Sequence, residues 1–293
     1  MKVKEQKLHE HGFVRFLDIM GDDNSIADAA RVSYGEGTRS VSDNRNLIRY
    51  LVRNKHTSPL EMVEVKFHLK LPIFIMRQLV RHRTASLNEY SGRYSIMTDD
   101  CYEPSDDYIQ PQSQTNKQGR DGEIKDVWKT NYKQKIHEAI AKTRVAYKFL
   151  LGNDSTPQGG LSRELARTVL PVSNYTECYW KIDLHNFFHF CRLRMDSHAQ
   201  QEIRDYAIAM YELVKPHFPI AVEAFEDYSL GSKSFSRMEM NVLKYVFEHF
   251  PLMQHSSGYC KNILCYIDEV KENENLNFGL GKREWKELKE KFK

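Results

Sequence analysis

The sequence predicts an α+β protein, because both strand-like and helix-like periodicities recur along the chain. Residues 62–71 alternate strictly between apolar and polar side chains, which is typical of a strand with one buried face. Residues 40–54 instead place Leu47, Ile48, Leu51 and Val52 on one face of a helix. The 293 residues allow one large domain or two small ones, with a sizeable core in either case.

The remaining elements of the first third of the chain follow from local signals. Residues 12–21 form a predicted strand that ends at Gly21, and residues 22–34 begin with capping side chains and continue as a helix. After the alternating strand, Pro72 occupies the first turn of another helix, a position that proline tolerates. We expect this helix to end at the Arg81-His82-Arg83 triplet, where the chain turns into a loop.

The rest of the chain is predicted to be mostly helical. Residues 99–123 are polar and contain Pro, Ser, Gln and Gly, which predicts a long surface excursion. A long helix that ends at Gly152-Asn153 comes next, because glycine is a common helix terminator. The predicted elements are an excursion at 99–123, the long helix at 123–153, a short helix at 162–171, a strand at 172–183, one or two helices at 184–216, and a charged helical tail from Ser229 that carries no motif we can assign.

Composition excludes several classes of protein. Hydrophobic content of 41% and charged content of 28% fit a globular protein, and a net charge of +3 is too small to argue for bulk binding of nucleic acid. The five cysteines form no C-x-x-C pair, so we expect reduced thiols in an intracellular protein. Neither a signal peptide nor a membrane span is expected, because the first 16 residues lack an apolar core and no apolar run approaches 18 residues.

The segment 81–95 (RHRTASLNEYSGRYS) combines cations, hydroxyls and one glycine in a short stretch. A positive end of a helix would explain Arg81 to Arg83 through the helix dipole, but not Ser91 and Arg93 beyond the turn. An anion site needs forked arginine donors with small hydroxyl and backbone donors nearby, and Gly92 would allow close approach of the backbone. Both interpretations remain open on these residues alone.

A second constellation lies at 183–200 (DLHNFFHFCRLRMDSHAQ). His185 and His189 are four residues apart and share a helix face, which suggests a metal site that Asp196 and His198 could complete. The commoner alternative is that these histidines fill packing or capping positions. Arg192 and Arg194 lie among apolar residues, where an arginine usually needs an anionic or planar partner.

Two further motifs have ordinary structural explanations, and several chemistries find no support. Residues 53–62 carry His56, Ser58 and Glu61 around a proline, which also suits a connection between a helix and a strand. Arg163 and Arg167 are four apart, as on a solvated helix face. Cys178 and Cys191 lie in apolar surroundings without an evident base, and neither a G-x-G-x-x-G motif nor a P-loop is present.

These motifs together resemble the flavin-dependent thymidylate synthases. Arg-His-Arg followed by seven residues and a serine, Arg81 to Ser91, is the signature of that family. Other blocks occur in the family's order over about residues 12–228: AARVSYG, HTSPLE, PIFIMRQLVRHR, NEYSGRYS, RELARTVLP and LRMDSHAQ. The resemblance divides the chain into a flavin-dependent thymidylate synthase domain at 1–228 and a helical extension of unknown role at 229–293.

The resemblance implies a fold, a reaction and an assembly. The implied fold is a central antiparallel-rich sheet flanked by helices. The implied reaction makes dTMP from dUMP, with 5,10-methylenetetrahydrofolate as carbon donor and NADPH as reductant through FAD. The implied assembly is a homotetramer whose active sites are each built from several subunits, in a cytoplasmic enzyme that binds neither nucleic acid nor membrane.

Carried over residue by residue, the resemblance also implies site residues. The implied FAD contacts are Ser58, Arg81, His82, Arg83, Glu89, Asp183, Leu184, His185 and His189. The implied dUMP contacts are Gln78, Arg81, Glu89, Ser91, Gly92, Arg93, Arg167 and Arg194. Arg194 is the implied catalytic residue: it activates the uracil ring electrostatically, and no enzyme nucleophile and no metal take part.

Two other functions compete with this interpretation. The first is a metal-dependent hydrolase that uses His185, His189 and His198. The second is a non-catalytic module that binds nucleic acid through arginine-rich helix ends, against which the modest charge and the lack of a basic stripe argue.

Overall fold

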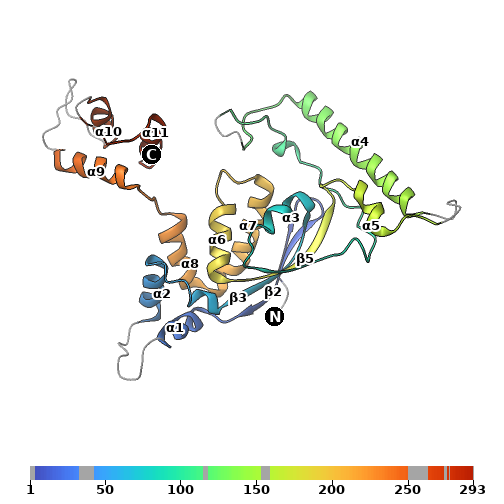
Figure 1. Ribbon diagram of the computed structural model, residues 1–293, viewed down its shortest axis with the longest axis horizontal. Helices are drawn as coiled ribbons and strands as arrows, with labels where there is room; N and C mark the ends of the chain where they lie inside the picture. Colours follow the sequence, from blue (N-terminus) through green and yellow to red (C-terminus); the bar gives the residue numbers. More distant parts are fainter. Residues whose placement is uncertain are drawn as a thin grey trace. The chain divides into compact units, whose positions relative to one another are not determined.

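The computed structural model describes residues 4–32, 43–114, 118–152, 159–249, 263–273, 276 and 278–292. The chain divides into two compact units, Met1–Leu230 and Gly231–Lys293 (Figure 1). In these ranges, no helix combines the length and the apolar character that crossing a bilayer demands.

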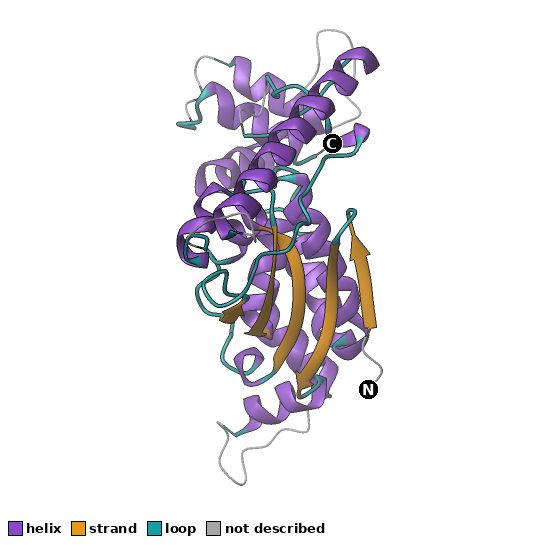
Figure 2. Ribbon diagram, turned by 90° about the vertical axis from the view of Figure 1, so that its right-hand side faces the viewer, coloured by secondary structure: helices purple, strands orange, loops and turns teal. Residues whose placement is uncertain are grey.

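The first unit is built on a five-stranded sheet in which all neighbouring strands are antiparallel (Figure 2). The strands run in the order β1 (Lys4–Leu8), β2 (Gly12–Met20), β3 (Glu64–Pro72), β5 (Tyr175–Asp183) and β4 (Ser86–Glu89). The predicted α+β fold with a central antiparallel sheet is therefore confirmed. The edge strands β1 and β4 were not expected, because neither has a buried face that would produce an apolar alternation.

The alternation predicted for β3 places its apolar residues on the covered face of the sheet. Val65, Phe67 and Leu69 are buried, whereas Lys66 between them is exposed. Phe67 lies opposite both Phe16 of β2 and Trp180 of β5 in the register, so one aromatic layer spans the three central strands. This buried layer makes β3 and β5 a rigid support for the segments that leave their ends.

Eight helices of the first unit are described. They are α1 (Asp23–Arg31), α2 (Asn44–Arg53), α3 (Ile73–Leu79), α4 (Asp126–Leu151), α5 (Arg163–Ala166), α6 (Leu184–Arg194), α7 (Gln201–Val214) and α8 (Pro219–Phe225). α6 contacts β5, and α7 contacts β1 and β2, so these two helices cover the apolar face of the sheet (Figures 1 and 2). The predicted helices at 22–34, 40–54 and 72–83 are confirmed with shorter bounds, and 184–216 contains two helices.

Two residues set the helix boundaries that matter most for the site. Asp183 ends β5 and caps α6, since its carboxylate accepts the backbone N–H of Asn186 at 2.9 Å. Gly152 ends α4 with φ of +81°, a left-handed conformation that favours glycine. The Asn153 part of that predicted terminator, like part of the AARVSYG motif, lies outside the described residues.

The 99–123 segment differs from the surface excursion that its composition suggested. Tyr102 is buried and donates its hydroxyl to Glu202 at 2.8 Å, and Arg120 donates to the same carboxylate at 3.1 Å. Tyr108 donates to Asp205 at 2.6 Å. The segment is thus fastened to the first turns of α7 by polar contacts, which hydrophobic periodicity cannot reveal.

The second unit contains α9 (Arg237–His249), α10 (Ile263–Glu272) and α11 (Lys282–Glu290), which confirms the helical tail. These helices share a small core that includes Val242, Ile267 and Leu288. Cys265 of α10 is disulfide-bonded, so the expectation of reduced thiols is wrong there, whereas Cys101, Cys178 and Cys191 are free.

Candidate active site

The ends of α3 and α6 bring together three of the predicted residues, Gln78, His82 and Arg194, which we call the Arg194 cluster. Arg194 Nε donates to His82 Nε2 at 3.1 Å, and Arg194 Nη2 lies 3.5 Å from the backbone oxygen of Gln78. α3 ends at Leu79, and the chain turns back so that the backbone N–H of His82 meets the oxygen of Leu79 at 3.0 Å. The turn that links α3 to the Arg81-His82-Arg83 triplet therefore directs His82 toward α6.

His82 is the neutral partner in this cluster. Its ring is 9% exposed and packs edge-on against Phe190, with centroids 4.9 Å apart. Burial, and then the nearby charges of Arg194 and His189, lower the pKa of His82 to about 4. A neutral imidazole can accept the Arg194 N–H, so it orients the guanidinium without cancelling its charge. Arg81 and Arg83, on either side of His82, are exposed.

A second group, which we call the Arg167 cluster, consists of Ser91, Gly92, Arg93 and Arg167. The backbone N–H of Arg93 meets Ser91 Oγ at 3.3 Å, which fixes a tight turn after β4. A Cβ at Gly92 would lie 3.1 Å from Arg167 Cδ and 2.9 Å from Met97 Sδ, so a glycine is needed for Arg167 to approach the turn. Arg93 is paired with Glu164 at 3.1 Å, and Arg167 is exposed.

The neighbouring Glu89 belongs to β4 and is exposed at the edge of the sheet. One of its carboxylate oxygens accepts the hydroxyl of Thr176 at 2.9 Å, which fixes its direction. Within the described ranges, no hydrogen bond or ion pair joins the Arg194 cluster to the Arg167 cluster. The two clusters are therefore not linked directly by polar contacts among the described residues.

Two of the predicted flavin residues of α6, His185 and His189, line a pocket of about 300 Å³, which we call the α6 pocket. His185 and His189 form one wall, and His56 and Thr57 come from the loop after α2. The apolar part of its lining is Leu51, Val52, Leu60, Phe188 and Phe225. This is a largely apolar hollow with a few polar groups, as in sites for aromatic ligands.

The other predicted flavin residues do not line this pocket. Ser58 is exposed in the loop that contributes His56 and Thr57, and Asp183 caps α6. The side chain of Leu184 is fully buried in the core, and its backbone N–H is bonded to the oxygen of Val63 at 3.0 Å. Leu184 thus serves the packing of α6 against the sheet.

The α6 pocket and the Arg194 cluster adjoin through two histidines. The rings of His82 and His189 have centroids 6.1 Å apart. Burial, with the charges of Arg192 and His185, lowers the pKa of His189. Both rings are therefore neutral at neutral pH, and the ring contact between them links the wall of the pocket to the partner of Arg194.

The described residues give little support to the metal interpretation of the same histidines. Among them, no group of three or more His, Cys, Asp and Glu side chains is arranged to hold a metal ion. His198 is exposed and its Nδ1 lies 2.8 Å from Asp196, in the turn between α6 and α7.

The free thiols are poor nucleophiles in this structure. Burial, and then the carboxylates of Glu89 and Glu177, raises the pKa of the Cys178 thiol to about 12. Cys191 is completely buried, which raises its pKa well above the ordinary value. Both residues pack in the core, as the sequence indicated.

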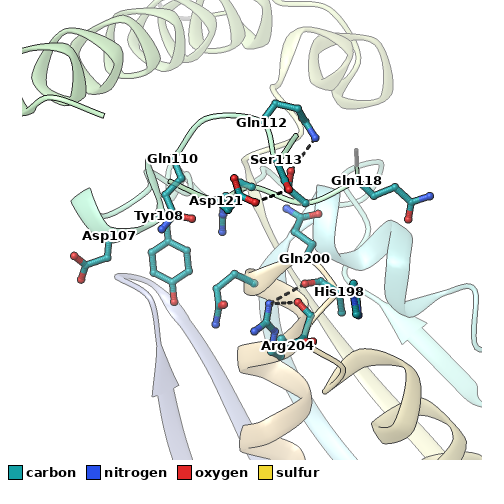
Figure 3. Close-up of a pocket in the computed structure, with 15 residues that line it drawn as sticks. Asp107, Tyr108, Gln110, Gln112, Ser113, Gln118, Asp121, His198, Gln200 and Arg204 are labelled. Atoms are coloured by element: carbon teal, nitrogen blue, oxygen red, sulfur yellow. Dashed lines mark hydrogen bonds between the residues drawn. The ribbon is translucent and has the colours of Figure 1, made fainter. Parts of the chain in front are cut away.

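A larger polar pocket, of about 740 Å³, lies between the 99–123 segment and the start of α7. Figure 3 shows Gln200 on one side and Gln110, Gln112 and Ser113 on the other. It contains none of the predicted FAD or dUMP residues, although His198 of the alternative metal site lines it, and Gln200 accepts a hydrogen bond from Gln78 Nε2 at 2.6 Å. Sequence reasoning missed Gln200, although it lies within the LRMDSHAQ block, because an amide carries no charge or periodic signal.

Comparison with known proteins identifies the family. Residues 15–220 match the family described as "Thymidylate synthase complementing protein". The chain belongs to this family, whose members include the flavin-dependent thymidylate synthases.

Two relatives and one solved structure illustrate the similarity. The flavin-dependent thymidylate synthase of Ehrlichia ruminantium (strain Gardel) is 44% identical over 288 residues, 97% of this chain and 87% of that protein. The protein of the same name from Dictyostelium discoideum is 49% identical over 248 residues, 82% of this chain and 80% of that protein. The UMP/dUMP methylase PolB of Streptomyces cacaoi, solved with 5-Br dUMP, is 31% identical with a TM-score of 0.67 over 76% of this chain and 98% of that one.

Proposed function

We propose that this protein is a flavin-dependent thymidylate synthase that methylates dUMP to dTMP. The observation that carries the proposal is the Arg194 cluster, formed by motifs of this family and adjoining the α6 pocket through His82 and His189. The relatives named above support the flavin dependence, and the 5-Br dUMP bound to PolB supports a deoxyuridylate substrate. The proposed carbon donor is 5,10-methylenetetrahydrofolate, and NADPH is the proposed reductant through FAD.

We assign dUMP to the residues of the two clusters, with Arg81 and Glu89 beside them. Ser91, Gly92, Arg93 and Arg167 suit the phosphate, because they supply two guanidinium groups, a hydroxyl and a close backbone approach. Gln78 and Arg194 suit the pyrimidine ring, since an amide and a guanidinium can together read a flat edge of donors and acceptors.

We assign FAD to the α6 pocket and the residues around it. The lining suits a flat ring system, because aliphatic and aromatic side chains surround His56, His185 and His189. Ser58, Arg81, His82, Arg83, Asp183 and Leu184 lie on the segments that adjoin this pocket or the Arg194 cluster. A volume of about 300 Å³ is small for a dinucleotide, so one chain would hold only part of FAD.

The proposed chemistry rests on two features, the protonated thiols of Cys178 and Cys191 and the fixed position of Arg194. The raised pKa values of Cys178 and Cys191 leave them protonated, so the ring is activated without an enzyme thiolate. Arg194 supplies a fixed positive charge where negative charge develops on the pyrimidine. When bound, the flavin supplies the reducing equivalents, and the protein supplies position and field.

We propose that the complete site needs a homotetramer. No polar contact among the described residues joins the two clusters of one chain, and other copies would complete each site. The 26-residue helix α4 buries only Ile140 and Tyr147, while Val145 and Phe149 are 71% and 68% exposed. An exposed apolar surface of this kind is typical of an interface between copies of a chain.

The remaining parts of the proposal concern place and domains. We propose that residues 1–228 carry the activity and that residues 229–293 form a helical extension without a catalytic part. We also propose a cytoplasmic enzyme, because its proposed substrate is a nucleotide; the disulfide at Cys265 argues against this location, and the free Cys101, Cys178 and Cys191 accord with it.

An anaerobic assay tests the function directly. The bound flavin is reduced, dUMP and 5,10-methylenetetrahydrofolate are added, and dTMP is measured. We expect a yellow protein that forms dTMP and holds no stoichiometric zinc. A colourless zinc protein without dTMP formation would instead support the hydrolase alternative. Sedimentation with and without FAD tests the assembly, and a stable monomer that binds FAD tightly would contradict the tetramer.

A further inference from the structure

The side chain of Gln78 is already engaged by another amide. Its Nε2 donates to Oε1 of Gln200 at 2.6 Å, while its backbone oxygen faces Nη2 of Arg194 at 3.5 Å. With Nε2 directed at Gln200, Oε1 of Gln78 points elsewhere and makes no hydrogen bond with the described residues. The orientation of the Gln78 amide is thus defined, with its oxygen as the exposed hydrogen-bond acceptor.

Glu202, two residues after Gln200, lines a second pocket together with it. This carboxylate is almost fully buried, and its Oε1 accepts from Tyr102 at 2.8 Å and from Arg120 at 3.1 Å. Burial alone would raise the pKa of Glu202, but its own backbone N–H, Arg120, Tyr102 and the Gln200 side chain outweigh it and lower the pKa. Oε2 of Glu202 has no hydrogen-bond partner among the described residues, and an ionised carboxylate only accepts hydrogen bonds, so its charge favours the amide nitrogen of Gln200 on the side of Glu202.

The backbone around Gln200 is also restrained. Gln200 is the residue that precedes α7, and Arg204 Nη2 donates to the backbone oxygens of Ser197 and Ala199 at 3.0 Å each (Figure 3). Tyr108 fastens the same helix through Asp205. The Gln200 side chain thus extends from a restrained turn, which limits the directions from which it can bond to Gln78.

We infer that Gln200 is a positioning residue. It fixes which end of the Gln78 amide, oxygen or nitrogen, faces the pyrimidine, so that the enzyme accepts uracil and rejects cytosine. The inference rests on the proposed function, in which Gln78 faces the pyrimidine of dUMP. Uracil presents an N3–H donor, which the oxygen of Gln78 can accept. Cytosine presents a bare N3 acceptor at that position, so two acceptors would face each other and binding would weaken.

Two substitutions separate this role from a structural one. Gln200→Met keeps the length of the side chain but removes the acceptor, so the Gln78 amide can turn freely. Gln200→Lys offers only donors, so it should turn the oxygen of Gln78 inward and present the nitrogen to the pyrimidine. Gln110→Met is the matched control, because Gln110 lines the same polar pocket as Gln200 and takes no part in the hydrogen bond between Gln78 and Gln200.

The experiment measures dissociation constants of dUMP and dCMP on the FAD-bound tetramer, by perturbation of the flavin absorbance. We expect Gln200→Met to bind dUMP about threefold to tenfold more weakly, the range for one hydrogen bond, with unchanged FAD content. Gln200→Lys should lower the preference for dUMP over dCMP further, by about tenfold to a hundredfold, because it reverses the orientation of the Gln78 amide. Gln110→Met should keep the wild-type preference.

Three outcomes would overturn the inference. The first is that both Gln200 variants keep the wild-type preference for dUMP over dCMP. The second is that Gln110→Met loses as much of this preference as the Gln200 variants do. The third is that the Gln200 variants lose FAD in parallel with any loss of this preference. None of these outcomes depends on turnover. If the wild-type protein instead failed to form dTMP in the anaerobic assay while it still preferred dUMP over dCMP, the proposed reaction would be wrong and the role of Gln200 would stand.

Discussion

Replacing Arg194 with alanine removes the one cation that the structure aims from α6 at the turn after α3. The guanidinium has five N–H donors; Nε holds His82 at 3.1 Å and Nη2 faces the oxygen of Gln78 at 3.5 Å. The remaining donors can meet the pyrimidine as charge develops on it. Loss of one comparable donor at an oxyanion site costs about 2.7–4 kcal/mol, so we expect dTMP formation to slow about 100- to 1,000-fold.

Arg194→Lys should recover little of this rate. A lysine offers a point charge with three donors and no planar fork, so it cannot hold His82 and a flat pyrimidine edge at once. Both variants should fold and retain FAD, because the contacts of Arg194 with His82 and Gln78 contribute only about 0.5–1.5 kcal/mol each to folding.

The assay is single-turnover formation of dTMP at saturating dUMP, with dUMP affinity followed through the flavin absorbance. Arg77→Ala is the control, since Arg77 is an exposed arginine of the adjacent helix α3 outside both clusters. Turnover near the wild-type rate in Arg194→Ala would refute the reasoning and leave Arg194 a packing or subunit-contact residue.

Three other predictions follow from the site. Because the pKa of His82 is about 4 in the folded protein and about 6.5 when unfolded, the unfolded state binds the extra proton first. The free energy of unfolding should therefore fall by at most about 3 kcal/mol as the pH drops from about 6.5 to 4, and a His82→Gln variant should lose that part of the pH dependence in urea titrations. Cys178→Ala and Cys191→Ala should each lower stability by about 1–3 kcal/mol but keep turnover; a folded variant that binds FAD and dUMP without forming dTMP would restore a cysteine nucleophile. Gly92→Ala should displace Arg167 and weaken dUMP binding more than FAD binding in titrations of each ligand, and equal effects on both ligands would argue against a phosphate role for this turn.

The sequence determined the elements whose residues carry their own periodic or capping signal. The alternation at 62–71 predicted β3 and its buried face, whereas the assignment of the site to the motif Arg81 to Ser91 stays a prediction. It did not predict β1 or β4, because edge strands with exposed side chains depend on their partners for their conformation.

Tertiary structure alone decided which predicted residues meet. Hydrogen bonds are directional and act over about 3 Å, so no pattern along the chain can show that Arg194 reaches His82, 112 residues away. The same holds for the contact between Gln78 and Gln200, and for the buried carboxylate of Glu202 that ties the 99–123 segment to α7. Local sequence sets periodicity and caps, whereas contacts between distant polar groups exist only once the sheet and its helices have packed.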